Sequence, residues 1–173
     1  LKTLISDGMT KTSMDRQKIM MGVLDLGNIT VEDIMLPHNE IVGIDLNASN
    51  QANTRIIEGN FHSSLPVYKD VLDNLQGVLD LNEFLKDIDL SSFDNDLLRK
   101  YMKKAYFIPE KTALSQQLVE FKNNNQKTGF AVDEYGNIQG LITIEDIFEE
   151  IVGDYLEETK KLNKGIRPKR VGD

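Results

Sequence analysis

Few side chains in this sequence are spaced so that they could perform chemistry. Ser63 and Ser64 follow His62, which brings together the residue types of a nucleophile and a general base. The serines lack the glycine-x-serine-x-glycine context of a hydrolase nucleophile, and nothing in the sequence marks His62 as their activating base. The other histidine is His38, and the absence of cysteine excludes a thiolate metal site and a cysteine nucleophile. The sequence therefore predicts a protein that is not an enzyme.

Thr143 and Asp146 form a more informative pattern, because a hydroxyl and a carboxylate stand three positions apart where a strand should pass into a helix. In one interpretation Thr143 caps the helix and Asp146 is the acid of a capping box. In the other, the hydroxyl and the first backbone N–H groups face an anionic group, while the carboxylate accepts hydrogen bonds from ligand hydroxyls. The two residues alone leave both interpretations open.

A run of acidic residues surrounds Asp146 and continues toward the C-terminus. Its members are Glu145, Asp146, Glu149, Glu150, Asp154, Glu157 and Glu158. The simplest interpretation is a solvated helix face, because a divalent cation needs several oxygens that converge on one point and helical spacing alone does not supply this. We therefore expect no tightly bound metal, and direct sensing of Mg2+ by this helix stays an alternative.

The composition restricts the class of protein. The chain has 173 residues, of which 40% are hydrophobic, and its formal net charge is -8. This size suits one compact domain or two small ones that share a core, and the acidic balance argues against nucleic-acid binding. No apolar stretch approaches the length of a membrane-spanning helix, and the start at Leu1 resembles neither an initiator methionine nor a signal peptide. We expect an excised soluble fragment.

An internal repeat indicates the architecture. Asn74–Leu79 (NLQGVL) matches Asn137–Ile142 (NIQGLI) at an offset of 63 residues. Each copy follows an apolar run with charged turn residues and precedes an acidic helix, so the pattern predicts strand, tight turn, strand and helix twice. Upstream, Met35–Pro37 is similar to Phe107–Pro109 at an offset of 72, which predicts about nine extra loop residues in the first copy. Two such small halves should pack together pseudo-symmetrically.

The remaining segments set the expected boundaries. A capping-box pattern at Thr12 and Asp15 begins an amphipathic helix that Gly27 ends, and the residues before Thr12 suit a linker. The expected apolar face of this helix consists of Ile19, Met20, Val23 and Leu26. The predicted organisation is a linker and N-terminal helix (1–29), a first repeat (30–92), a connecting helix (93–105), a second repeat (106–158) and a basic linker or tail (159–173).

Five motifs stand in fixed order between about residues 15 and 158. They are Asp33–Pro37 (DIMLP), Ser63–Tyr68 (SSLPVY), Asp73–Leu79 (DNLQGVL), Val132–Gly136 (VDEYG) and Gly140–Gly153 (GLITIEDIFEEIVG). In sequence and spacing they resemble the paired CBS domains of the CorC/HlyC and CNNM proteins, the hemolysin-like magnesium and cobalt efflux family. The resemblance implies an α+β fold in which two β-α-β-β-α repeats form a tandem CBS-domain (Bateman) module, packed pseudo-symmetrically behind an N-terminal helix.

The same resemblance implies a function. In this family the CBS pair is a non-catalytic regulatory module of a membrane ion transport protein, a soluble domain on the cytoplasmic side of the cell membrane. It follows a membrane domain and precedes a small C-terminal domain, so the opening helix and the basic tail would be the links to them. CBS pairs commonly associate as flat homodimers, which predicts a homodimer here.

The implied ligand is an adenine nucleotide, AMP or another, with Mg-ATP possible. Thr143 and Asp146 take the family's positions for the phosphate and ribose contacts, and the rest of the pocket is carried over from the first half. The full set is Met35, Leu36, His62, Ser63, Ser64, Leu65, Pro66, Thr143 and Asp146. The corresponding residues of the first half are Asp80 and Glu83, which suit a phosphate and a ribose poorly, so that site is expected to be vacant.

Two positions depart from the family pattern. Related members often have a threonine where Leu36 stands and an arginine where Ser64 stands, and an arginine would be well placed to meet phosphate. Its loss weakens the case for a triphosphate more than for a monophosphate, so the sequence favours an AMP-like ligand. The alternative is an interaction scaffold with vacant nucleotide sites, which only dimerises the transporter.

Overall fold

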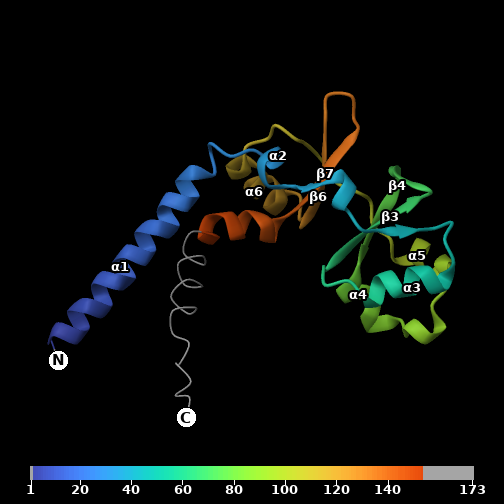
Figure 1. Cartoon of the computed structure of the whole chain (residues 1–173), viewed down its shortest axis with the longest axis horizontal. Coiled ribbons are helices and arrows are strands. Elements are labelled where there is room, and N and C mark those ends of the chain that lie inside the picture. The colour runs from blue at the N-terminus through green and yellow to red at the C-terminus, as the bar shows by residue number, and fades with distance from the viewer. Residues whose placement is uncertain (1, 154–173) are drawn as a thin grey trace, which may run out of the picture.

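The computed structural model describes residues 2–153 of the chain, with side chains from Thr12 onward. It contains the predicted β-α-β-β-α unit twice, in two lobes that lie side by side (Figure 1). The first repeat consists of β2 (Ile44–Asp45), α3 (Asn50–Glu58), β3 (Ser64–Lys69), β4 (Val71–Asp80) and α4 (Leu81–Asp87). The second consists of β5 (Phe107–Pro109), α6 (Leu114–Asn123), β6 (Thr128–Val132), β7 (Ile138–Thr143) and a helix over residues 144–153. The predicted fold class is confirmed.

Shorter elements precede and join the repeats. They are α1 (Lys2–Asp25), α2 (Val31–Ile34), β1 (Leu36–Pro37), η1 (His38–Glu40), η2 (Leu90–Ser92) and α5 (Asn95–Tyr101). The expected connecting helix is α5, and its buried Leu98 packs into the core of the first repeat. The predicted basic tail lies outside the described residues.

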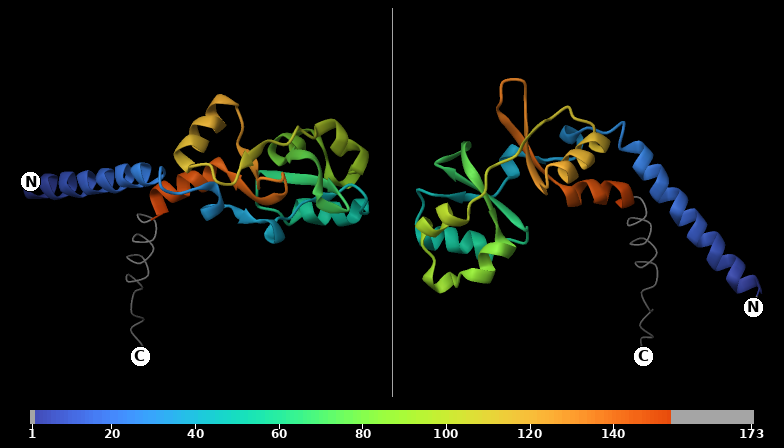
Figure 2. Two further views of the ribbon diagram at one scale, coloured as in Figure 1. Left: turned by 90° about the horizontal axis from the view of Figure 1, so that it is seen from above. Right: turned by 180° about the vertical axis from the view of Figure 1, so that it is seen from behind.

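The N-terminal helix differs from the prediction in its start. Helix α1 begins at Lys2, so the residues before Thr12 are helical and do not form the linker that was expected. A single glycine inside a helix lowers the stability of the helix by about 1 kcal/mol, which is too little to end the helix there. The predicted end near Gly27 is confirmed. The helix projects from the two lobes as a rod (Figure 2), and Gly22 contacts the backbone of Ile151 in the helix over residues 144–153.

The apolar face expected on α1 is largely open. Ile19, Met20 and Val23 are exposed, whereas Leu26, just after the helix, is buried in the core of the second repeat. The helix is therefore present as expected, but the structure buries only the last of these four apolar residues. Among the helices that the structure describes, none is long and apolar enough to cross a membrane.

The two sheets exchange edge segments. One sheet has the order β2-β3-β4 and the other the order β1-β7-β6-β5. Strand β1 precedes the first repeat, yet it pairs antiparallel with β7 of the second, with Leu36 opposite Leu141. In return Lys103, which precedes the second repeat, forms an antiparallel bridge with Val78 of β4. Each repeat therefore completes the sheet of the other.

Each exchanged segment crosses a glycine. A Cβ atom placed on Gly140 would lie 2.6 Å from the carbonyl oxygen of Leu36, and one on Gly77 would lie 2.5 Å from the carbonyl oxygen of Lys103. Such distances are shorter than side chains tolerate, so only glycine allows the two backbones to approach this closely. The glycines in the repeated NLQGVL and NIQGLI motifs are thus explained by the crossing.

The strand registers correct the predicted alignment of the two repeats. Ile44 pairs with Val67, which pairs with Gly77, and the corresponding series in the second repeat is Ile108, Ala131 and Gly140. Ile44 is therefore equivalent to Ile108, at an offset of 64, and the predicted offset of 72 was wrong. Likewise Leu36 is equivalent to Lys103, at an offset of 67, since they pair with the equivalent residues Leu141 and Val78. The first repeat carries only a few extra residues.

Three apolar clusters hold the molecule together. One lies within each repeat and contains the equivalent pairs Ile57 and Phe121, and Phe84 and Ile147. The third lies between the sheets and is built from Leu72, Phe130 and Ile138. Since this cluster draws residues from both repeats, the predicted pseudo-symmetric packing is confirmed.

The glycine crossing gives the first testable prediction. Gly140→Ala should lower the free energy of unfolding by about 1–3 kcal/mol, because the obstacle is a backbone carbonyl that cannot rotate away. Equilibrium urea unfolding measures this difference. The matched control is Gly27→Ala, where the nearest atom to a new Cβ would be 3.7 Å away. Equal stability of the two variants would contradict the close crossing.

Candidate functional site

Thr143 and Asp146 lie where β7 passes into the following helix, and they form a reciprocal capping box. The backbone N–H of Thr143 donates to Asp146 Oδ2 at 2.8 Å, and the backbone N–H of Asp146 donates to Thr143 Oγ1 at 3.2 Å. The capping interpretation is therefore confirmed. Among the described residues, no partner hydrogen-bonds to Asp146 Oδ1 or accepts the hydroxyl proton of Thr143, and both side chains are only half-buried. Capping and ligand binding are compatible here.

The strand exchange brings the predicted first-half residues toward this pair. Leu36 lies beside Leu141 on β7, two residues before Thr143. Ser64 begins β3, and its Oγ accepts a hydrogen bond from the hydroxyl of Thr128 at 3.3 Å. Thr128 is in turn the register partner of Thr143. Segments that are far apart in sequence therefore meet at the start of the last helix.

The predicted pocket residues are not equally accessible. His62 and Ser63 are exposed, and Met35, Leu36 and Ser64 are half-buried. Leu65 and Pro66 are buried, and Leu65 packs in the core of the first repeat. The side chain of Leu65 therefore has a structural role, and only the backbone of Leu65 could contact a ligand.

The first half has an equivalent arrangement with different chemistry. Asp80 is equivalent to Thr143 and caps α4, accepting a hydrogen bond from the backbone N–H of Glu83 at 3.2 Å. The carboxylate of Glu83, equivalent to Asp146, forms an ion pair with Lys103. The hydrogen bond to Glu83 raises the pKa of the Lys103 ammonium above its ordinary value. Glu83 is thus engaged by a cation of the exchanged segment.

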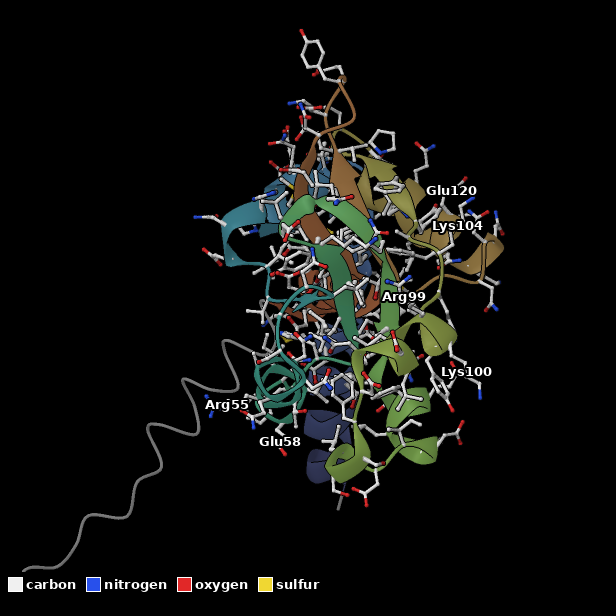
Figure 3. The ribbon with its side chains drawn as sticks, turned by 90° about the vertical axis from the view of Figure 1, so that its right-hand side faces the viewer. Arg55, Glu58, Arg99, Lys100, Lys104 and Glu120 are labelled. Atoms are coloured by element: carbon white, nitrogen blue, oxygen red, sulfur yellow. The ribbon has the colours of Figure 1, made fainter. Side chains whose placement is uncertain are left out.

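A cavity of about 380 Å³ opens at this first-half arrangement. It is lined by residues of both repeats, among them Ser64, Asp80, Lys103, Lys104, Lys127 and Thr128. Lys104 lies on the flank of the molecule opposite Arg55 (Figure 3). In this half the sequence indicated only Asp80 and Glu83. The lysines were not predicted, because the alignment at an offset of 72 did not match Lys103 with Leu36.

The VDEYG motif is a hydrogen-bonded hairpin tip. The carboxylate of Asp133 accepts hydrogen bonds from the backbone N–H groups of Tyr135 and Asn137, each at 2.9 Å. Hydrogen bonding, the bond from Asn137 above all, lowers the pKa of the Asp133 carboxyl. Gly136 has a φ of 83°, which a residue with a side chain adopts only with strain. These residues shape the turn, and the side chain of Tyr135 stays 88% exposed.

The other candidate groups do not converge. His38 Nε2 lies 3.5 Å from Asp73 Oδ1, and Glu149 and Glu150 are exposed on the last helix. Within residues 2–153 no group of three or more His, Cys, Asp or Glu side chains is placed to hold a metal ion. The remaining acidic residues of the predicted run, Asp154, Glu157 and Glu158, lie outside the described residues.

Comparison with known proteins identifies this architecture. The CBS domain family profile matches residues 98–153. A solved CBS-domain pair with bound AMP from Klebsiella pneumoniae shares 43% sequence identity, with a TM-score of 0.65, and the match covers 72% of this chain and 99% of that one. The CBS domain of a bacterial CNNM/CorC family Mg2+ transporter in complex with ATP is 28% identical, with a TM-score of 0.70, over 80% of this chain and 97% of that one.

A longer relative has the same segment. The UPF0053 inner membrane protein YfjD of Escherichia coli is 39% identical over 156 residues, which cover 90% of this chain and 36% of that protein. The chain therefore spans little more than a third of this curated relative. The fold and the exchanged strands define a paired-repeat module. The chain belongs to the CBS-domain family, as a tandem pair of the CNNM/CorC type.

The ion pair of the first half gives the second prediction. Glu83→Gln should lower the pKa of Lys103, because the hydrogen bond to Glu83 is the main cause that raises it. An NMR titration of the lysine side chains measures this shift. Lys111 is the internal control, since its pKa is raised by Glu32 at a separate site and should not change. An unaltered Lys103 titration would show that the pair does not form in solution.

Proposed function

We propose that the chain is the regulatory adenine-nucleotide-binding module of a CorC-type membrane ion transport protein. The observation that supports the proposal is the capping box of Thr143 and Asp146 at the start of the last helix. Leu36 pairs with Leu141 on the strand that leads into this helix, and Ser64 is hydrogen-bonded to Thr128, the register partner of Thr143. The helix N-terminus supplies N–H groups and a positive dipole for phosphate, and the free oxygen of Asp146 can accept a ribose hydroxyl. The proposed role is non-catalytic, because regulation requires only that the module binds its ligand.

The solved relatives support the choice of ligand. One CBS-domain pair of similar fold was solved with AMP and another with ATP. A nucleotide of about 23 heavy atoms at about 0.3 kcal/mol each gives about -7 kcal/mol, or roughly 10 μM. Such an affinity suits a sensor of cellular nucleotide rather than a permanently bound cofactor.

The second-half site favours AMP over Mg-ATP. Its phosphate end has Leu36 and Ser64 where a cation would be needed to neutralise a triphosphate. In the first half, by contrast, the exchanged segment brings Lys103, but Glu83 is paired with it and Asp80 replaces the hydroxyl. Ribose recognition therefore belongs to the second half, where Thr143 and Asp146 have the better chemistry.

Regulation requires that the nucleotide distinguishes two arrangements of the module. A ligand shifts such an equilibrium only by its difference in affinity for the two states. The module forms a homodimer on the cytoplasmic side of the cell membrane, and nucleotide occupancy is passed to a transport domain outside this chain. The magnesium transporter and inner membrane relatives support this placement.

Two other functions remain testable. In the scaffold alternative the module dimerises the transporter and binds no nucleotide, which the departures at Leu36 and Ser64 favour. In the magnesium alternative the acidic last helix senses Mg2+ directly. Thermal stabilisation by Mg2+ alone, lost on neutralising Glu149 and Glu150, would support the magnesium alternative.

The third prediction tests the nucleotide site. Asp146→Ala should abolish AMP binding in calorimetric titration, because it removes the ribose acceptor. Loss of the capping box should cost about 1 kcal/mol of stability without unfolding the module, which thermal unfolding checks. Glu83→Ala is the matched control, since it removes the equivalent acid of the first half, and it should bind AMP like the wild type.

Each other outcome of this titration has a meaning. Loss of binding in Glu83→Ala alone would place the nucleotide in the first half. A folded wild-type dimer that binds neither AMP, ADP nor ATP, with or without Mg2+, would support the scaffold.

The fourth prediction concerns the phosphate end. Ser64→Arg should strengthen ATP binding by about tenfold relative to AMP, because one guanidinium adds a charge-assisted contact to the outer phosphates. Parallel titrations with both nucleotides measure this ratio, and Ser64→Gln is the polar, uncharged control. An unchanged ratio would mean that the phosphates do not point toward β3.

A further inference from the structure

Helix α1 and the helix over residues 144–153 are in backbone contact at Gly22. A Cβ atom placed on Gly22 would lie 2.3 Å from the carbonyl oxygen of Ile151 and 3.2 Å from its Cα atom. Both obstacles are backbone atoms that cannot rotate away, so only glycine allows the two helices to lie this close. Gly22 stands one turn before the end of α1 at Asp25. The rest of α1 projects away from the lobes (Figure 2).

The helix over residues 144–153 joins this contact to the proposed nucleotide site. It starts at the capping box of Thr143 and Asp146, and it passes Gly22 near its other end. Its isoleucines at 144, 147 and 151 are spaced by three and four residues, and all pack into the apolar cluster of the second repeat. A helix packed along one face transmits a displacement from its start to its end.

The chain that follows α1 is fastened to the second repeat. The carbonyl of Leu26 accepts a hydrogen bond from the N–H of Ser115 at 3.3 Å, and the carbonyl of Ile29 accepts one from the N–H of Leu114 at 2.9 Å. Leu26 is also buried in the same apolar cluster as the last helix. The root of α1 is therefore a fixed point, and the contact at Gly22 determines the direction in which α1 leaves it.

The first repeat has no such projecting helix. Val31 is equivalent to Leu98, because the N–H groups of Met35 and Met102 donate to their carbonyls at 2.9 and 2.8 Å. Each of these methionines also lies against the glycine of a crossing. Before Leu98 the chain folds onto the first repeat through the buried Phe93, whereas before Val31 it leaves as α1. The direction of α1 therefore depends on the second repeat, which contains Thr143 and Asp146.

We propose that α1 is a lever that reports occupancy of the second-half site, and that the last helix moves it at the contact between Gly22 and Ile151. The lever rests on the proposed function and adds to it the residues that carry the regulation. A nucleotide phosphate bound by the N–H groups at the start of the last helix shifts that helix, and Ile151 then shifts Gly22.

The geometry of a helix amplifies this shift. Gly22 lies four residues from the root at Leu26, or about 6 Å along the axis, whereas Met14 lies twelve residues from it, or about 18 Å. Helix shifts in regulatory proteins are about 1–2 Å. A shift of about 1 Å at Gly22 therefore displaces Met14 by about 3 Å.

The distance between two spin labels tests the lever. The chain has no cysteine, so Met14→Cys on α1 and Tyr135→Cys at the hairpin tip provide two labelling positions, both of them exposed. The labelled full chain is diluted with unlabelled protein, so that pulsed electron paramagnetic resonance measures distances within one molecule. Saturating AMP should shift the mean distance by about 3 Å. The control pair is Val71→Cys with Tyr135→Cys, which reports on the two hairpins without α1 and should not shift.

A matched pair of alanine variants tests the contact itself. In Gly22→Ala the new methyl group meets the carbonyl of Ile151, so α1 should stand displaced without AMP, and AMP should no longer move it. Gly27→Ala adds the same methyl group just after α1, where the nearest atom is 3.7 Å away, and it should respond like the wild type. Thermal unfolding checks that both variants are folded, and calorimetric titration checks that both bind AMP.

The results separate the lever from the proposed function. If the wild type binds AMP and the distance between Met14 and Tyr135 does not change, the lever is overturned and the nucleotide site stands. If the control pair shifts as much, the hairpin moves rather than α1, and the lever is again overturned. A response of Gly22→Ala like that of the wild type would show that the movement does not pass through Gly22. If the wild type binds no adenine nucleotide, both proposals fail together.

Discussion

The close approach of two backbones at Gly77 and Gly140 is the constraint on which the rest of this structure depends. At each glycine a segment from the other repeat crosses the central hairpin and adds to its sheet. Without that approach the two sheets would lose their exchanged edges, and the cluster of Leu72, Phe130 and Ile138 between them would open. Two small repeats, each too small to bury a full core alone, thereby become one module.

The same crossing gives the two repeats equivalent helix starts with different chemistry. One exchanged segment brings Leu36 beside Leu141 on β7, and the other brings Lys103 beside Val78 into the first-half cavity. The helix after β7 in the second half is capped by Thr143 and Asp146, and α4 in the first half is capped by Asp80. The second half therefore combines a hydroxyl and a carboxylate at the start of its helix with the apolar Leu36, and the first half combines lysines with acids that partly neutralise them.

The sequence predicted the local parts of this arrangement well and its long-range parts poorly. The hairpin offset of 63 and the capping pattern at Thr143 are local, and both are confirmed. The alignment of Pro37 with Pro109 failed because each proline follows two apolar residues, although β1 crosses to the other repeat and β5 stays in its own. The start of α1 was predicted too late in the sequence, because the low helix propensity of the residues before Thr12 was interpreted as a linker.

The sequence by itself determined the repeat, the strand and helix types and the family, since periodicity, turn residues and motif spacing are properties of neighbouring residues. Only the tertiary structure decided which segment completes which sheet, and so which side chains line each cleft. The contacts between Leu36 and Leu141, between Val78 and Lys103, and between Lys103 and Glu83 join residues that are distant in the chain. Their formation depends on the packing of both repeats together, which no local pattern records.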